Sequence, residues 1–181
     1  KQTGLWENYS AEDLATPQAF TRDPNLVWSW YQWRRQQVAS KKPNPAHIAL
    51  AQWQYHSRST HHQLTLITQN VDDLHEQAGS VVTHLHGNLW RNKCSRCDTP
   101  YQSQSNGSYD SDDSINFDET LIICQHSEGY IKPDIVWLGE SLPLQAWHKA
   151  DEAAADCDVL ISIGTYSLLY PAAGMAKLVK H

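Results

Sequence analysis

The 181-residue sequence contains no unbroken apolar run approaching the roughly twenty residues that a helix needs to cross a bilayer. It also has no excess of positive charge, because 14 Lys and Arg are outnumbered by 20 Asp and Glu and the formal net charge is -6. A non-specific nucleic-acid binder needs a basic face to displace counterions from phosphate. We therefore expect a protein with no direct nucleic-acid partner and no membrane partner.

Cysteine and methionine are both scarce. The four cysteines include one tight pair, Cys94 and Cys97, which fits a metal site in a reducing compartment better than a disulfide framework. This favours an intracellular location, cytoplasmic or, in a eukaryote, mitochondrial. The only methionine is Met175, the chain starts at Lys1, and no secretory signal pattern follows. We expect a partial chain that holds one ordinary domain and a small satellite module.

A group of polar side chains follows an apolar run at residues 64–68, which predicts a buried strand. Gln69, Asn70 and Asp72 come directly after it, at the strand end where open α/β sheets keep their ligand sites. Their amide and carboxylate groups can bind hydroxyl groups and a carboxamide. Capping of the next helix by Asn70 and Asp72 is the alternative, and it is compatible with ligand binding.

Polar residues also follow the next predicted strand. A short helix is predicted at 72–78, and a strand at 81–85 then ends on His86 and Gly87. A neutral imidazole titrates near the working pH and can take a proton from a hydroxyl, so His86 is the predicted general base. A surface or capping role is the alternative in a chain with ten histidines. His84 shares the face of His86 by alternation, and we expect it to be packed or hydrogen-bonded.

The remaining periodic segments complete an α/β pattern. The predicted helices are 24–39, 45–56 and 143–156, and the predicted strands are 121–124, 131–138 and 158–163. The last of these strands is apolar enough to be fully buried in a parallel sheet. The helix at 45–56 should bury Ile48, Leu50, Ala51 and Trp53. The predicted fold class is therefore α/β, a doubly wound parallel sheet that carries a small metal module.

The cysteines have the spacing of a zinc site. In Cys94-x-x-Cys97 one turn can point two thiolates at one zinc ion, and Cys124 can add a third. The expected second pair is incomplete, because the chain reads Cys-Gln-His-Ser from Cys124 onward. The fourth ligand is therefore His126, Ser127 or water. Two small buried thiols and one unrelated cysteine are the alternative.

These motifs resemble, in their order and spacing, the core signature of the sirtuins, the NAD-dependent protein lysine deacylases. The matching segments are Thr68-Gln69-Asn70-Val71-Asp72-Asp73-Leu74-His75, His86-Gly87-Asn88-Leu89 and Cys94-x-x-Cys97. The resemblance implies a cofactor-covering loop and a helical insertion at 1–57, a Rossmann-like NAD-binding domain at 58–90 and 131–181, and a small zinc-ribbon module at 91–130. It also implies a glycine-rich phosphate loop before Lys1 and a last strand after His181.

The resemblance assigns roles to the NAD-binding residues. His86 would activate a hydroxyl of the nicotinamide ribose, while Gln69, Asn70 and Asp72 would surround the nicotinamide and that ribose. Further NAD contacts are implied in a strand-to-helix turn, at Gly164, Thr165 and Ser167. The chain departs from the family there, because Tyr166 replaces a small residue. The zinc is implied to be structural.

The resemblance also implies a strand that binds the acyl-lysine peptide. It comprises Val136, Trp137, Leu138, Gly139 and Glu140. An extended peptide can pair with such a strand through its backbone, which requires little of the peptide's sequence. An ordinary buried strand that ends at the glycine is the alternative.

Tyr31 and Arg34 suggest which acyl group the enzyme prefers. They lie three residues apart and therefore share a helix face. An arginine among apolar residues is costly unless it meets an anion, and its planar fork suits a carboxylate. Tyr31-x-x-Arg34 resembles the pair of the class III sirtuins, which favour succinyl, malonyl or glutaryl lysine. A solvated Arg34 beside a core tyrosine is the alternative, and Arg35 is expected to face solvent.

The leading interpretation is therefore an NAD-dependent protein lysine deacylase that removes succinyl, malonyl or glutaryl groups and, more weakly, acetyl groups. Its partners would be acylated lysines of substrate proteins, and its cofactors NAD and Zn²⁺. Two alternatives stay open. The chain is either a catalytically inactive fragment that serves as a binding module, or an enzyme that transfers ADP-ribose from NAD to protein.

Overall fold

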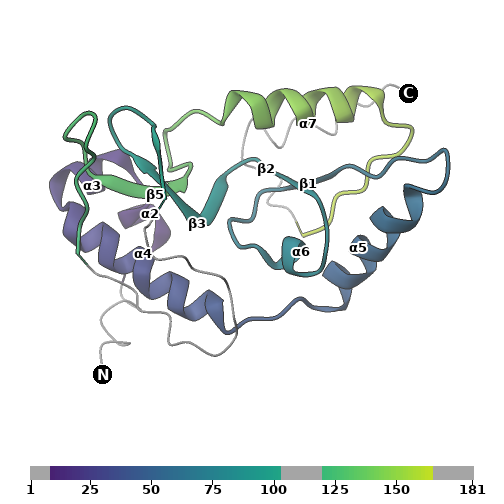
Figure 1. Ribbon diagram of the computed structural model, residues 1–181, viewed down its shortest axis with the longest axis horizontal. Coiled ribbons are helices and arrows are strands. Elements are labelled where there is room, and N and C mark those ends of the chain that lie inside the picture. The colour runs from purple at the N-terminus through teal and green to yellow at the C-terminus, as the bar shows by residue number, and fades with distance from the viewer. Residues whose placement is uncertain (1–8, 103–119, 165–181) are drawn as a thin grey trace. The chain divides into compact units, whose positions relative to one another are not determined.

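The structure, a computed structural model, describes residues 9–102 and 120–164 (Figure 1). The chain divides into two compact units. Unit 1 comprises residues 1–41 and 88–140, and unit 2 comprises residues 42–87 and 141–181. Each unit is thus assembled from segments that are far apart in the sequence. Within the described ranges, every helix is too short or too polar to span a bilayer.

Unit 1 begins with three helices, α2 (Ala11–Leu14), α3 (Pro17–Arg22) and α4 (Pro24–Ala39). Side-chain caps fix the starts of the last two. Thr16 Oγ1 accepts a hydrogen bond from the Ala19 amide at 3.1 Å, and Asp23 Oδ1 accepts one from the Leu26 amide at 3.0 Å. Proline occupies the first turn of both helices, where no intrahelical N–H bond is lost. The helix predicted at 24–39 is confirmed.

Unit 1 also contains a three-stranded sheet in the order β4-β3-β5. Its strands are β3 (Gly87–Cys94), β4 (Pro100–Tyr101) and β5 (Ile131–Ile135). β3 and β4 are antiparallel, with Asn92 opposite Tyr101. The strand predicted at 131–138 is therefore shorter than expected. The one predicted at 121–124 is reduced to an isolated bridge between Ile123 and Tyr130.

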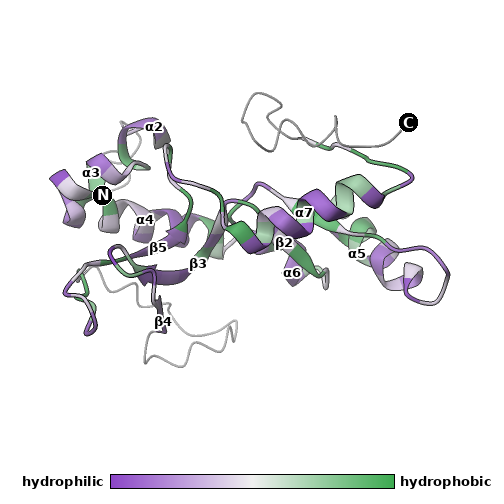
Figure 2. Cartoon of the chain, turned by 90° about the horizontal axis from the view of Figure 1, so that it is seen from above, coloured by the Kyte–Doolittle hydropathy of each residue, from purple (hydrophilic) through white to green (hydrophobic). Residues whose placement is uncertain are grey.

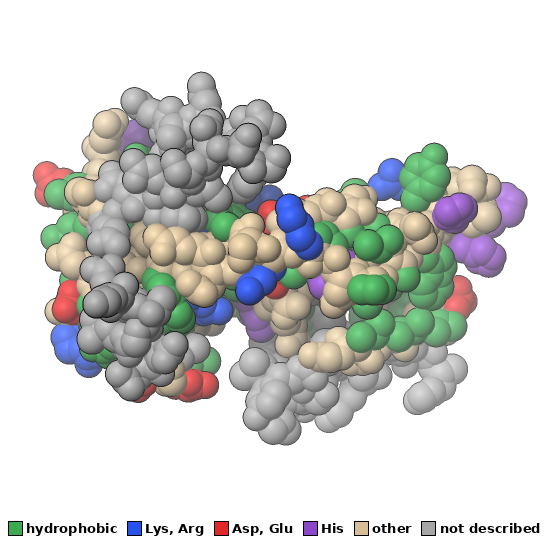
Figure 3. Space-filling model, turned by 90° about the horizontal axis from the view of Figure 1, so that it is seen from below, with side chains coloured by type: hydrophobic (Ala, Val, Ile, Leu, Met, Phe, Trp, Pro, Cys, Tyr) green, Lys and Arg blue, Asp and Glu red, His purple; other side chains and the backbone are tan. Residues whose placement is uncertain are grey.

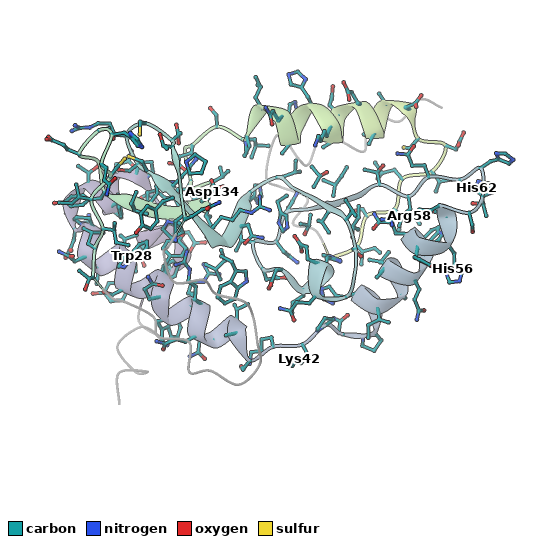
Figure 4. The ribbon with its side chains drawn as sticks, in the orientation of Figure 1. Trp28, Lys42, His56, Arg58, His62 and Asp134 are labelled. Carbon is teal, nitrogen blue, oxygen red and sulfur yellow. The ribbon has the colours of Figure 1, made fainter. Side chains whose placement is uncertain are left out.

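The core of unit 1 joins α4 to the cysteine-bearing segments. Trp28, labelled in Figure 4, packs with Cys94, Cys124 and Ile131. Each of these four residues is at most 6% exposed. Two of the predicted metal ligands are therefore part of the hydrophobic core of the unit.

Unit 2 contains α5 (Pro45–Ser57), β1 (Leu66–Thr68), α6 (Leu74–Gln77), β2 (Val82–His84) and α7 (Leu144–Asp156). β1 and β2 are parallel, with Leu66 opposite Val82 and Thr68 opposite His84. Parallel strands end at the same edge of a sheet. The polar residues that follow β1 and β2 therefore meet at one edge, as the sequence predicts.

Helix α7 packs on this strand pair through one face. Trp147 and the buried Ala150, on consecutive turns, share a core with Ile67 and Leu85. Apolar and polar residues alternate along α7 in Figure 2, as expected for a helix that covers a sheet on one side. The helix predicted at 143–156 is confirmed, one residue shorter at its start.

The burial predicted for α5 is partly wrong. Ala51 is buried, but Ile48 is 45% exposed and Trp53 is 49% exposed. A polar side chain attaches the helix to the residue that precedes β2. Gln54 Nε2 donates to the Val81 carbonyl at 2.9 Å, and Gln54 Oε1 accepts from the Val81 amide at 2.7 Å. Helical periodicity alone did not indicate this attachment.

The predicted buried strand at 158–163 is also wrong for the described residues. They have no regular secondary structure, and Val159, Ile161 and Ile163 are 74%, 59% and 62% exposed. Hydrophobic side chains are visible at the surface in Figure 3. An apolar run is buried as a strand only where other strands flank it, and no described strand is paired with this one.

Candidate active site and metal centre

His86 lies two residues after the end of β2, and its ring contacts a backbone carbonyl just after β1. The Leu85 amide donates to the Thr68 carbonyl at 2.9 Å, which extends the strand pairing by one residue. His86 Nδ1 then lies 3.0 Å from the Gln69 carbonyl oxygen. Because a carbonyl can only accept, Nδ1 carries the proton, and Nε2 presents a lone pair. Within the described residues, no hydrogen-bond partner occupies Nε2.

The environment of His86 favours its neutral form. Partial burial lowers the pKa of His86 below its ordinary value of 6.5, because an imidazolium would lose hydration there. The hydrogen bond to the Gln69 carbonyl opposes this shift and is the smaller effect. At neutral pH the ring is therefore a base with a free lone pair, which is the state that the predicted role requires.

Gln69, Asn70 and Asp72 lie together in the loop between β1 and α6. The side-chain amides of Gln69 and Asn70 bind no other group among residues 9–102 and 120–164, so both are available to a ligand. Asp72 Oδ1 accepts from the Leu74 amide at 3.1 Å, so the predicted capping role is present for this residue. The structure thus places the Gln69 backbone against His86, and Asn70 and Asp72 follow Gln69 in the same loop.

His84 is hydrogen-bonded, as predicted, and extends this network. Its Nδ1 lies 3.1 Å from the Asn70 carbonyl oxygen, and its Nε2 lies 2.5 Å from Glu76 Oε1. The first contact ties β2 to the loop that carries Asn70, and the second ties it to α6. His84 therefore supports the geometry of this loop rather than offering a second base.

The downstream segment that is predicted to bind NAD is described only at its first residue. Gly164 has a φ of 60°, in the left-handed region that favours glycine. Thr165 and Ser167 lie outside the described residues.

The predicted substrate strand is held by an ion pair that the sequence did not indicate. Lys132, which is 2% exposed, donates from Nζ to both carboxylate oxygens of Glu140 at 3.1 Å and to the Ile135 carbonyl at 3.1 Å. Glu140 Oε2 also accepts from the Trp137 amide at 2.8 Å. Burial lowers the pKa of Lys132, and Glu140 opposes that shift. An isolated Lys in an apolar strand was the only sequence signal for this contact.

The other residues of this strand lie in a tight turn. Val136 is half-buried, Leu138 is 48% exposed, and Gly139 has a φ of 88°. The Leu138 amide donates to the Ala15 carbonyl at 3.0 Å, so that backbone donor is already bound within the chain. The segment that could pair with a peptide is correspondingly short.

Tyr31, Arg34 and Trp137 come together in unit 1. Trp137 Nε1 donates to the Tyr31 hydroxyl at 2.9 Å. Burial raises the pKa of Tyr31 to about 12, so its hydroxyl keeps its proton. The Arg34 guanidinium lies 4.9 Å from the ring centroid of Trp30 and 5.9 Å from that of Tyr31. Tyr31 of the predicted pair therefore contacts a tryptophan of the predicted substrate strand, and Arg34 lies over the Tyr31 ring.

The expectation that Arg35 faces solvent is wrong. Arg35 is 7% exposed, and its guanidinium donates to the Leu89 carbonyl at 2.8 Å, to Asn92 Oδ1 at 2.7 Å and to Gln32 Oε1 at 3.1 Å. These acceptors include β3, which lies more than fifty residues away in the sequence. Arg35 therefore joins α4 to the sheet of unit 1.

The three predicted metal ligands form one cluster. The Sγ atoms of Cys94, Cys97 and Cys124 lie within 4.8 Å of one another, and those of Cys97 and Cys124 are 3.8 Å apart. Tetrahedral zinc with bonds of about 2.3 Å places two sulfur ligands about 3.8 Å apart. All three thiols are free of disulfide bonds. The donors and their spacing therefore fit a zinc ion.

Comparison with known proteins covers nearly the whole chain. A model of the Sir2 family matches residues 1–171. The NAD-dependent protein deacylase of Methylococcus capsulatus is 46% identical over 178 residues, which are 98% of this chain and 68% of the relative. NAD-dependent protein deacylase 2 of Pyrobaculum aerophilum is 41% identical and is matched over 66% of its length. The chain thus spans about two thirds of the length of these relatives.

Solved structures agree with the fold. A complex of a Sir2 homolog with NAD superposes with a TM-score of 0.80 at 39% identity, over 97% of this chain and 64% of that one. A Sir2 protein bound to an acetylated peptide superposes with a TM-score of 0.74 at 27% identity, over 92% of this chain and 66% of that one. The predicted Rossmann-like α/β class with a zinc module is confirmed. This chain belongs to the Sir2 family.

Proposed function

We propose that this chain carries the catalytic core of an NAD-dependent protein lysine deacylase. The geometry of His86 carries the proposal, because Nδ1 is fixed by the Gln69 carbonyl and the lone pair on Nε2 is free among the described residues. The names of the relatives support it, since they are NAD-dependent protein deacylases. The reaction moves the acyl group from lysine to ADP-ribose and releases nicotinamide.

The residues present fit the parts of NAD that take part in this reaction. NAD supplies the ribose that accepts the acyl group. The side-chain amides of Gln69 and Asn70 can each donate and accept, which suits a carboxamide and ribose hydroxyls. His86 Nε2 is the atom that holds the proton of the attacking hydroxyl. The Gln69 carbonyl fixes the orientation and tautomer of the ring, so the base is ready before the substrate binds.

We also propose that the preferred acyl group carries a carboxylate. Arg34 is half-buried among aromatic rings, and no Asp or Glu within the described ranges pairs with it. A guanidinium in such a place gains most from a bidentate carboxylate. The protonated Tyr31 hydroxyl can donate to the same group. Succinyl, malonyl and glutaryl lysine all offer this carboxylate, whereas acetyl lysine does not.

The decisive experiment incubates the whole chain with NAD and a succinylated or acetylated peptide, and detects 2′-O-acyl-ADP-ribose by mass spectrometry. We expect this product from the unchanged chain, and a loss of at least about a hundredfold in rate for His86→Ala. His62→Ala, which removes an exposed histidine, should leave the rate unchanged. NAD binding without any acyl product would contradict the deacylase and favour a binding module. Label from NAD on protein would favour ADP-ribosyl transfer instead.

A further inference from the structure

The two cysteine turns of unit 1 have the same backbone geometry. In the first turn, the Arg96 amide donates to Cys94 Sγ at 3.3 Å, and the Asp98 amide donates to the Cys94 carbonyl at 3.2 Å. The Cys94 amide donates to the Thr99 carbonyl at 2.9 Å, and Asp98 has a φ of 55°. This turn directs the third residue after Cys94, which is Cys97, toward the metal cluster.

The second turn repeats each of these contacts. The His126 amide donates to Cys124 Sγ at 3.4 Å, and the Glu128 amide donates to the Cys124 carbonyl at 3.1 Å. The Cys124 amide donates to the Gly129 carbonyl at 2.8 Å, and Glu128 has a φ of 57°. By this correspondence His126 takes the position of Arg96 in the first turn. Ser127 takes the position of Cys97.

Side-chain positions agree with the backbone. Ser127 Oγ lies 3.1 Å from Cys94 Sγ, within the cluster of sulfur atoms. His126 is exposed, and its ring is not among the described groups whose ligand atoms lie within 4.8 Å of one another. The amide of His126 is used to hold Cys124, just as that of Arg96 holds Cys94. The backbone of the turn therefore presents Ser127, and not His126, at the position that Cys97 has in the first turn.

We propose that the fourth ligand position of this zinc site belongs to Ser127 and is filled by oxygen, from its hydroxyl or from a water beside it. A neutral hydroxyl or water binds zinc more weakly than a thiolate, and it exchanges more readily. The site therefore holds its metal through three thiolates and keeps one exchangeable position, which a small imidazole or thiol from solution can occupy.

Cobalt substitution tests the ligand set without measuring deacylation. The whole chain is loaded with Co²⁺, and its absorption is recorded in the thiolate charge-transfer and ligand-field regions. We expect a spectrum of three thiolates and one oxygen, which changes when imidazole is added. His126→Ala should give the same spectrum as the unchanged chain. A spectrum that loses a nitrogen ligand in His126→Ala, or that is indifferent to imidazole, would overturn the proposal.

Zinc affinity provides the second test, by competition with a chromogenic chelator. Ser127→Cys completes the second pair, and we expect it to bind zinc at least about tenfold more tightly, because a thiolate replaces a neutral oxygen. Its cobalt spectrum should gain charge-transfer intensity and no longer respond to imidazole. His126→Ala is the matched control and should keep the affinity of the unchanged chain. If His126→Ala weakens zinc binding and Ser127→Cys does not strengthen it, histidine is the ligand.

Discussion

Neighbouring arginines of α4 have different surroundings. Arg34 stacks over Trp30 and Tyr31 and is half-buried, with no carboxylate partner in the described part of the chain. Arg35 is buried and donates to the Leu89 carbonyl and to Asn92. One guanidinium is therefore available to a ligand, whereas the other is a structural link within unit 1. Substituting the two residues separately distinguishes specificity from stability.

Arg34→Met should reduce the removal of succinyl groups far more than that of acetyl groups. A charge-assisted contact of this kind contributes about 1.5–3 kcal/mol, so kcat/KM for a succinylated peptide should fall by roughly tenfold to a hundredfold. Acetyl-lysine has no carboxylate to lose, and its kcat/KM should change little. The measurement is kcat/KM for matched succinylated and acetylated peptides with saturating NAD.

Two further arginines serve as controls for this comparison. Arg22→Met removes an exposed guanidinium and should affect neither substrate. Arg35→Met should lower the melting temperature and reduce both activities together, because buried acceptors lose their donor. If Arg34→Met behaves like Arg35→Met, with equal losses on both substrates, Arg34 does not bind the acyl carboxylate.

The pH dependence of catalysis follows from the environment of His86. Burial lowers the pKa of His86 below 6.5, so the ring stays neutral, and competent as a base, down to a lower pH than an exposed histidine would. We expect kcat/KM to be flat near neutrality and to decline only as the pH falls through this lowered pKa. A profile from about pH 5 to about pH 8 measures it. An acid limb centred above 6.5 would contradict this assignment.

At the scale of elements, β5 and the turn after it depend on one ion pair. The Lys132 side chain extends from β5 into the interior. Its ammonium group contacts both carboxylate oxygens of Glu140 and lies 3.7 Å from the centroid of the Trp137 ring. Glu140 accepts from the Trp137 amide as well. The pair thus closes the turn that carries Trp137, which in turn donates to Tyr31. The shape of the predicted acyl-lysine site depends on this closure.

A double-mutant cycle measures this dependence. Glu140→Gln leaves a nearly buried ammonium without its counter-charge, and should lower the free energy of unfolding by about 3 kcal/mol. Adding Lys132→Met should recover part of that loss, because no unpaired charge remains. Urea unfolding gives each value, and KM for the peptide should rise with the single change. Additive effects of the two changes would mean that the pair does not hold the turn.

The pair formed by Lys93 and Asp98 offers a matched control for the cycle. Their atoms are 3.1 Å apart, but the Asp98 side chain is 78% exposed. An exposed pair contributes about 1 kcal/mol or less, so Asp98→Asn should change stability much less than Glu140→Gln. A similar loss in both variants would point to a general electrostatic effect.

Local signals predicted the longer helices better than the strands. The starts of α4 and α5 could be predicted because each depends on a cap and a proline that are adjacent in sequence, Asp23-Pro24 and Asn44-Pro45. The exposure of residues 158–163 and the burial of Arg35 could not be predicted locally. Each depends on segments that lie far away in the sequence. The candidate site was likewise predictable only in part. Its residue types were evident, but the choice between His126 and Ser127 depended on the conformation of a turn.

At the scale of the whole molecule, each unit contains a hydrophobic cluster built from its own described residues. In unit 1 the core contains Cys94 and Cys124 together with Trp28, so metal binding and core packing involve the same residues. In unit 2 the core consists of Leu85 and Ala150 and their neighbours, with no predicted metal ligand among them. Stability that comes from the metal should therefore be local to unit 1.

Metal removal tests this locality by hydrogen exchange. Without zinc, the thiolates of the cluster repel one another or take up protons, and the turns that carry them lose the ion that joins them. The amides of Cys94 and Cys124, which donate to carbonyls at 2.9 Å and 2.8 Å, should lose protection when a chelator is added. The Leu85 amide of unit 2, bonded to the Thr68 carbonyl, should keep its protection. Added zinc should restore the first two amides, whereas equal loss in both units would show that the metal stabilises the entire chain.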